Sequence, residues 1–283
     1  MTGLWQILAL PGLEVVLVGA LAGLVGVLAV LDQRVFFAES VTHGAFPGAV
    51  LGVVIGAAVG LDHRQLSLVL FVGAFLMCLP LAWLMRALAA RPGISSQAAA
   101  GVVLTLGFAL GYFLATWFAP LPIQVSGFLT GSVLTVNAVD AGAAGLCLVG
   151  ALVLAAARGR RLLLHCFDPS AQGPRARRRH EATILLVILI TVVVLIPAVG
   201  TVLSIALIAA PAVGLKGLVP SLRAYVIAAP ACGALISTTG LGIAVAADLS
   251  AGGSIAVAAG VFCLACLGIA RMRAADMTSG PRR

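Results

Sequence analysis

The chain has 283 residues, of which 62% are hydrophobic and only 9% are charged, and its formal net charge is +8. Soluble domains carry about 25% charged residues, because a globular fold needs a polar surface. The composition therefore excludes a soluble globular protein and indicates an all-α, polytopic membrane protein surrounded by lipid. Because the arginines flank apolar runs, their charge reflects orientation in the membrane and predicts no nucleic-acid partner.

Apolar runs long enough to cross a bilayer, which takes about 20 residues, recur along the whole sequence. They predict one membrane domain over residues 1–283, with spans at 12–31, 45–61, 66–88, 95–117, 134–156, 182–199, 200–215, 222–243 and 253–270. The stretch 182–215 is too long for one crossing and short for two at about 1.5 Å per residue. Pro197, Gly200 and Pro211 favour a break there, so eight and nine spans both remain open.

Arginines are distributed unevenly between the segments that connect the spans. The segment from about 157 to 180 holds the arginines Arg158, Arg160, Arg161, Arg175, Arg177, Arg178 and Arg179. By contrast, no charged residue occurs between Pro92 and Val139. Since basic loops stay in the cytoplasm, we expect a cell-membrane protein whose 157–180 loop and C-terminus are cytoplasmic. Residues 121–137 are interpreted as an irregular half-helix or an interfacial segment on the outer side.

The stretch AESVTHGAFPG, residues 38–48, sets Glu39, His43 and Pro47 four residues apart at the start of the second predicted span. Side chains at i and i+4 share one face of a helix. A carboxylate and an imidazole together suit Zn²⁺, Mn²⁺ or Fe²⁺, and ionisable groups in a membrane usually face a polar path. Two interpretations stay open at this point, a pair of metal ligands and a helix-end cluster in interfacial water.

The remaining polar residues are expected at the ends of spans or on the surface. Gln97, after Ser95 and Ser96, is interpreted as part of a polar helix start. The other ionisable residues are assigned to span ends (Glu14, Asp140 and Asp248) and to the surface of the arginine-rich loop (His165 and His180). The six cysteines lie mostly in apolar runs and are expected to form no disulfide bond.

The sequence also lacks the common motif for ATP hydrolysis. Its only lysine, Lys216, lies in VGLKGL, so no G-x-x-x-x-G-K-[ST] phosphate loop exists. We therefore expect that the chain is not an enzyme. If it moves a solute uphill, the energy must come from a partner chain or from an ion gradient.

Four motifs in chain order carry a resemblance to a known family. They are the acidic-residue and histidine stretch at 39–48, SGFLTGSVLTV at 126–136, LLLHCFDPS at 162–170 and IPAVGTVLSIALIAAPAVG at 196–214. Together they resemble the ABC-3 family, the permease subunits of ATP-binding-cassette importers for manganese and zinc. The similarity runs from about residue 13 to 270. The family commonly has Asp where this chain has Glu39 and an acidic residue where it has Gln97, and its coupling loop is less basic.

The resemblance implies the architecture and the partners of the protein. It implies a type II importer fold like that of vitamin-B12 permeases, a homodimer of permeases, cytoplasmic ATP-binding-cassette ATPase subunits and an extracytoplasmic metal-binding protein. Zn²⁺ or Mn²⁺, with Fe²⁺ as a third candidate, would be the transported substrate, and no cofactor would be bound permanently.

The resemblance also implies roles for individual residues. Glu39 and His43 would line the metal pathway, with Gln97 and Pro47 as further lining candidates. The residues implied to couple the permease to the ATPase are Phe167, Asp168 and Pro169.

Two other classes of function are open from the residues alone. The first is an ion-coupled secondary transporter that uses Glu39 and His43 as a proton relay, although the sequence shows no convincing internal repeat. The second is a membrane scaffold without transport. A neighbouring ATPase gene with a phosphate-loop motif would favour the importer over both.

Overall fold

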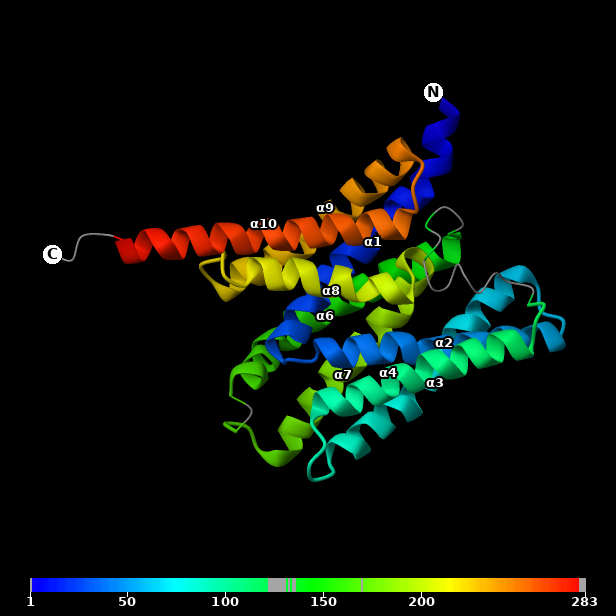
Figure 1. Ribbon diagram of the computed structural model, residues 1–283, viewed down its shortest axis with the longest axis horizontal. Helices are drawn as coiled ribbons and strands as arrows, with labels where there is room; N and C mark the ends of the chain where they lie inside the picture. The colour runs from blue at the N-terminus through cyan, green and yellow to red at the C-terminus, as the bar shows by residue number, and fades with distance from the viewer. Residues whose placement is uncertain (1, 122–130, 132, 134–135, 169, 280–283) are drawn as a thin grey trace.

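The structure is a computed structural model that describes residues 2–121, 131, 133, 136–168 and 170–279 (Figure 1). Over these residues it is helical and contains no strand, which confirms the predicted all-α class. The helices are α1 (Thr2–Leu31), α2 (Val35–Ala58), α3 (His63–Ala89), α4 (Ser96–Trp117), α6 (Ala138–Phe167), α7 (Pro174–Val199), α8 (Thr201–Leu215), α9 (Leu222–Ala247) and α10 (Ala251–Ser279). Most of the segment 121–137, predicted as a half-helix or an interfacial segment, lies outside the described residues.

In the described part of the chain, eight helices are long and apolar enough to cross a membrane. The remaining helix, α8, has 15 residues and spans only about 22 Å at 1.5 Å per residue, less than a hydrocarbon core of about 30 Å. The break expected within 182–215 is present at Gly200, whose φ of 86° is favourable only for glycine. The described part of the chain thus has eight helices of spanning length and one short apolar helix.

Helix α2 begins ten residues before the second span that the sequence predicted, at Val35 instead of residue 45. The mean hydropathy of this first part of the helix is low because it contains hydroxyl side chains. The hydroxyl of Ser40 donates to the carbonyl of Phe36 at 2.8 Å, and that of Thr42 to the carbonyl of Ala38 at 2.6 Å. Hydroxyls that bond within their own helix are compatible with a buried helix. The predicted start was therefore wrong, and Glu39 and His43 lie inside α2.

The arginine-rich segment 157–180 is mostly helical, so its prediction as a loop was wrong. Helix α6 continues to Phe167 and α7 begins at Pro174, which leaves only residues 168–173 as a connection. Arginine has a high helix propensity, and proline is favourable in the first turn of a helix. The basic residues therefore lengthen two helices beyond the apolar spans.

The helices α2, α3 and α4 lie side by side, and glycines bring their backbones close (Figure 1). A Cβ atom at Gly48 of α2 would overlap the carbonyl of Gly73 on α3. The same close approach joins α1 to α9, where a Cβ atom at Gly19 would overlap Gly233. Small residues allow such contacts between helices in lipid.

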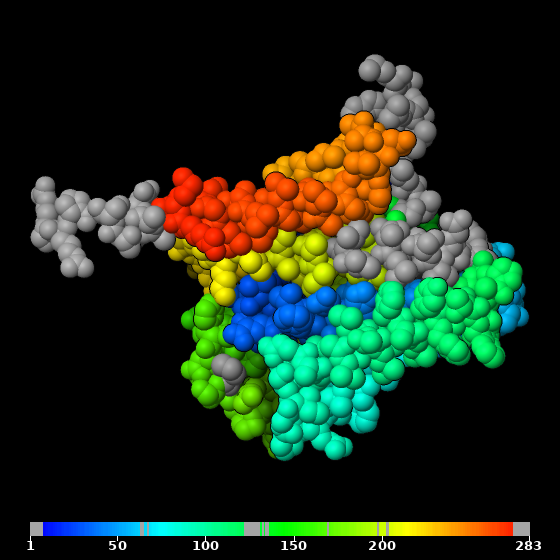
Figure 2. All heavy atoms as spheres, viewed as in Figure 1, coloured from blue at the N-terminus to red at the C-terminus, as the bar shows by residue number. Residues whose placement is uncertain are grey.

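The most deeply buried side chains belong to the middle of the bundle, and the outer helices expose apolar groups. Leu21 of α1, Ile188 and Leu195 of α7 and Leu207 of α8 are fully buried. In the view of Figure 2, α10 and α9 lie at one edge and α3 and α4 at the opposite edge. Large apolar side chains such as Trp83 are exposed on these outer helices. A surface of this kind fits a surrounding lipid phase, as the composition predicted.

Candidate functional site

Glu39 and His43 lie one turn apart on α2, where each is half-buried. Their neighbours Ser40, Thr42 and Gly44 are buried in the bundle. Within residues 37–50 of this helix, these two are the residues that are not buried. The predicted sharing of one helix face by Glu39 and His43 follows from this helical geometry.

Helix α4 runs parallel to α2 and fixes its position. The hydroxyl of Ser40 donates to the carbonyl of Ala100 at 2.8 Å. Further along, a Cβ atom at Gly107 would lie 2.9 Å from the Cα atom of Gly44. The two backbones are therefore almost in contact beside the Glu39–His43 pair.

The imidazole of His43 contacts an aromatic ring of α4 but forms no hydrogen bond through Nδ1. Its ring meets that of Phe108 edge to face, with centroids 5.7 Å apart and an interplanar angle of 76°. The Nδ1 atom is buried and has no hydrogen-bond partner in the described part of the chain. Leaving a buried polar atom unpaired costs free energy, so this nitrogen is an unusual feature of the bundle. The carboxylate of Glu39 also takes part in no ion pair among the described residues, where both salt bridges belong to Arg34.

Gln97 lies in the first turn of α4, where it is exposed. It is not the helix cap, because the hydroxyl of Ser95 accepts the hydrogen bond from the backbone N–H of Ala98 at 3.1 Å. Gln97 and Phe108 are eleven residues apart, which places them on one stripe of a 3.6-residue helix. Gln97 therefore lies on the face of α4 that contacts His43, nearer to the start of the helix.

The other predicted lining residue, Pro47, is buried within α2. No group of three or more His, Cys, Asp or Glu side chains that could hold a metal ion occurs within the described ranges. At Glu39 and His43, one copy of the chain has one carboxylate and one imidazole, fewer groups than a closed metal site contains.

The predicted coupling residues lie at the connection between α6 and α7. Phe167, the last residue of α6, is 66% exposed. The carboxylate of Asp168 accepts hydrogen bonds from the Ser170 hydroxyl and from the backbone N–H groups of Ser170 and Ala171, the latter two at 3.0 Å. These bonds, that of the Ser170 hydroxyl first, lower the pKa of Asp168. The result is an ordered, exposed acidic turn; Pro169 lies outside the described residues.

An ion pair connects this region to the helix that carries Glu39 and His43. Arg34, which precedes α2, donates from Nη2 to Oε1 of Glu181 on α7 at 2.9 Å and contacts Asp32 at 3.3 Å. Burial raises the pKa of Asp32, and the positive charge of Arg34 opposes that shift. The starts of α2 and α7 are thereby joined. Sequence reasoning missed this link because Arg34 and Glu181 are 147 residues apart and belong to no motif.

Two expectations about histidines and acids were wrong. His165, expected on the surface, is 4% exposed, and its ring lies 6.0 Å from that of His180. Because the arginine-rich segment is helical, one of its faces turns into the bundle. Glu14, expected at an interface, is 1% exposed in the packing of α1 against α6, and Asp140 is also buried and accepts the hydrogen bond from the Asn137 N–H at 3.1 Å.

Comparisons with known proteins agree with the motifs. The chain is 28% identical over 255 residues to the manganese transport system membrane protein MntC of Halalkalibacterium halodurans, covering 88% of this chain and 83% of the relative. It is 29% identical over 208 residues to the zinc transport system membrane protein TroC of Treponema pallidum, covering 71% of this chain and 68% of that protein.

A comparison with solved structures and a family profile agree with these sequence similarities. The solved structure of PsaBC from Streptococcus pneumoniae in complex with Fab has a similar fold, with a TM-score of 0.79 at 23% identity over 92% of this chain and 90% of that one. The profile described as the ABC 3 transport family matches residues 6–269. The resemblance that the four motifs indicated is therefore confirmed, and the chain belongs to the ABC 3 transport family.

Proposed function

We propose that this chain is the membrane-spanning permease subunit of an ATP-binding-cassette importer and forms the path for a divalent transition metal. The relatives named as manganese and zinc transport proteins support Mn²⁺ or Zn²⁺ as the substrate, with Fe²⁺ as a third candidate. The observation that carries the proposal is the half-buried Glu39–His43 pair on α2, with its unpaired imidazole nitrogen.

The two side chains act as transient ligands. A divalent ion that enters an apolar bundle must exchange water for protein donors, and the pair supplies one carboxylate and one imidazole. Two protomers of a homodimer would supply four ligands, the number of a tetrahedral Zn²⁺ site, whereas Mn²⁺ accepts more oxygen. Such a site must be weak, because a conducted ion has to leave again.

The energy for transport comes from partner chains. Cytoplasmic ATPase subunits dock at the turn around Phe167 and Asp168, and an extracytoplasmic metal-binding protein delivers the ion. The ion pair between Arg34 and Glu181 connects the start of α7 to the start of α2. Movement at the docking turn can thus reach the helix that holds the ligands.

The test is metal uptake by the chain reconstituted with its ATPase and binding protein in vesicles. His43→Ala and Glu39→Ala should each abolish uptake of Zn²⁺ and Mn²⁺ while the complex still assembles. Glu39→Asp should retain part of the activity, and Glu39→Gln should lose most of it. Ile55→Ala, on an exposed part of the same helix, is the matched control and should transport normally.

Two results would overturn the proposal. The first is normal uptake by both alanine variants, which would make the pair an interfacial cluster. The second is uptake by vesicles that contain this chain alone and are driven by a pH gradient without ATP. That result would favour a secondary transporter in which Glu39 and His43 relay protons.

A further inference from the structure

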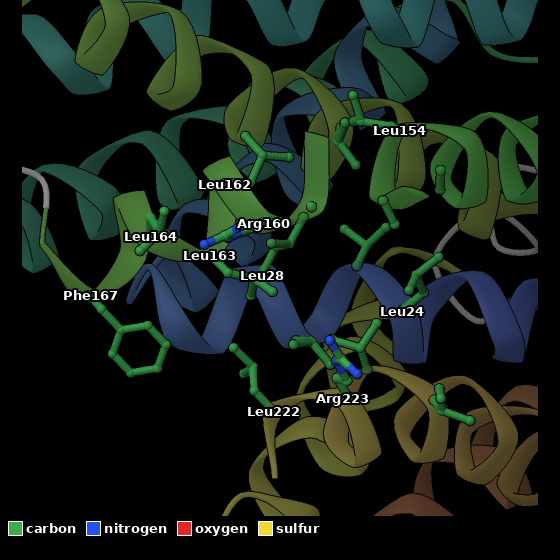
Figure 3. A pocket seen from close by; sticks show the side chains of 18 residues that line it. Leu24, Leu28, Leu154, Arg160, Leu162, Leu163, Leu164, Phe167, Leu222 and Arg223 are labelled. Carbon is green, nitrogen blue, oxygen red and sulfur yellow. The ribbon is translucent and has the colours of Figure 1, made fainter. Parts of the chain in front are cut away.

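A groove of about 640 Å³ lies along α1, between α6 and α9 (Figure 3). Its volume lies in the range of about 300–1,000 Å³ that is typical of ligand sites. Its lining comes from α1, α6, α7 and α9, so it is separate from the Glu39–His43 pair on α2. Most of its wall is apolar, with side chains such as Leu24, Leu28, Leu154, Leu163, Val226 and Ile227.

Two arginines, Arg160 of α6 and Arg223 of α9, also line the groove. Figure 3 shows Leu24 and Leu28 on α1, with Arg160 on one side of this helix and Arg223 on the other. Both arginines are exposed. Neither forms an ion pair with a carboxylate in the described part of the chain. Two guanidinium groups beside an apolar wall are therefore left without a protein counter-ion.

The two arginines lie at the same end of the bundle. Arg160 is near the end of α6, and Arg223 is the second residue of α9, while Leu28 is near the end of α1. The arginine distribution assigns this end to the cytoplasmic side. The cytoplasmic leaflet holds the anionic lipids of a membrane, and basic pockets between helices on that side bind their head groups.

We propose that the groove binds one anionic phospholipid, with an acyl chain along the leucine wall and the phosphate held by Arg160 and Arg223. Guanidinium groups form strong charge-assisted hydrogen bonds with phosphate. The apolar wall contacts the acyl chain of the lipid, and the two unpaired arginines pair with the negative charge of its phosphate. This site goes beyond the proposed transport function and does not depend on it.

Other occupants fit the groove less well. A metal ion would find no carboxylate, imidazole or thiolate among the lining residues. An apolar helix of a second copy of the chain would cover both guanidinium groups without pairing them, and unpaired charges are costly to bury. A free phosphate would leave the apolar wall unused.

The site can be tested by titrating the purified full chain in detergent with phosphatidylglycerol and with phosphatidylcholine of the same acyl chains. Native mass spectrometry counts the lipid that stays bound. We expect phosphatidylglycerol to bind at least about tenfold more tightly, because both lipids carry a phosphate but the cationic choline group of phosphatidylcholine offsets its negative charge beside the two arginines. Arg160→Gln and Arg223→Gln should each remove most of this preference.

Two further variants separate the parts of the site. Arg158→Gln changes an exposed arginine of the same helix that does not line the groove, and it should keep the full preference. Ala155→Phe fills the groove between the walls and should weaken both lipids. The glutamine variants alter exposed side chains, so they test the proposal even where Ala155→Phe fails to fold.

Several outcomes would overturn the proposal. One is equal retention of the two lipids, and another is a loss of preference in Arg158→Gln as large as in Arg160→Gln. Competition by glycerol phosphate as strong as that by the whole lipid would identify a free-phosphate site. Efficient disulfide cross-linking of two chains through Ile227→Cys would identify a second copy in the groove.

Discussion

The hydroxyl of Ser40 donates a hydrogen bond to the carbonyl oxygen of Ala100 across the α2–α4 contact, at 2.8 Å. The carbonyl of Phe36 in the same helix also lies 2.8 Å from this hydroxyl, so the two acceptors share its single proton. Ser40 directly follows Glu39, so this bond fixes where the carboxylate lies along the axis of α4. The position of the candidate ligands therefore depends on how closely α4 approaches α2.

Adding a methyl group at Gly107 should separate the two helices. A Cβ atom there would lie 2.9 Å from the Cα atom and 3.0 Å from the backbone nitrogen of Gly44, and a backbone cannot turn aside as a side chain can. Gly107→Ala should destabilise the protein by about 1–3 kcal/mol, as overpacking does, and should reduce metal uptake. Thermal unfolding in detergent and vesicle uptake measure the two effects.

Gly101→Ala is the matched control on the same helix, because a Cβ atom there meets nothing within 4 Å. It should leave uptake intact and should stabilise α4 slightly, since alanine favours a helix by about 1 kcal/mol over glycine. Equal unfolding temperatures for the two alanine variants would show that the close α2–α4 contact is not required.

Much of this arrangement could be predicted from the sequence. The apolar runs predicted the helical class and eight or nine spans, and the spacing of Glu39 and His43 predicted their shared face. These properties depend on residues close together in the chain, for which helical periodicity is decisive. The break at Gly200 was expected for the same local reason.

What could not be predicted depends on packing between distant segments. Hydropathy alone placed the start of α2 too late, because it cannot register that Ser40 and Thr42 bond to carbonyl groups. The burial of Glu14 follows from the contact of α1 with α6. The Arg34–Glu181 ion pair has no local pattern, and only the folded chain brings the two residues together.

Replacing Gly200 should disturb the junction of α7 and α8. Its φ of 86° lies in the region that side chains disfavour, so Gly200→Ala should cost about 1–2 kcal/mol. Gly142→Ala, at a helical position in α6 with nothing within 4 Å of the added Cβ atom, should be neutral or slightly stabilising. Thermal unfolding of both variants checks this, and an unaffected Gly200→Ala would contradict the strained junction.

Breaking the Arg34–Glu181 ion pair should uncouple ATP hydrolysis from uptake. Because both side chains are only partly exposed, a double-mutant cycle with alanine should give a coupling of about 0.5–1 kcal/mol in stability. In the reconstituted importer, either single alanine variant should lower the number of metal ions taken up per ATP hydrolysed. An unchanged ratio in both variants would exclude the pair from coupling, whatever its effect on stability.

The arginine distribution predicts the orientation of the helices. A reporter inserted at Gln172, in the α6–α7 connection, should be cytoplasmic, as should one fused to the C-terminus. A reporter at Ser250, between α9 and α10, should be outside. Labelling of introduced cysteines in intact cells with an impermeant reagent gives the same information. A cytoplasmic result at both Gln172 and Ser250 would rule out the predicted order of crossings.

Introducing a carboxylate at Gln97 should strengthen metal binding at the candidate site. Gln97 lies on the stripe of α4 that leads to Phe108, whose ring contacts His43, and ABC-3 permeases commonly have an acidic residue there. A further negative charge along the same face attracts a divalent cation and offers it another oxygen ligand. Gln97→Glu should therefore bind Zn²⁺ and Mn²⁺ several-fold more tightly in calorimetric titration of the assembled importer. It should also slow the release of the ion, so that uptake saturates at lower metal concentration and at a lower maximal rate.

Gln97→Ala, which removes the amide without adding charge, should bind metal as the unaltered protein does. Identical affinities for the glutamate and alanine variants would show that Gln97 lies outside the metal path.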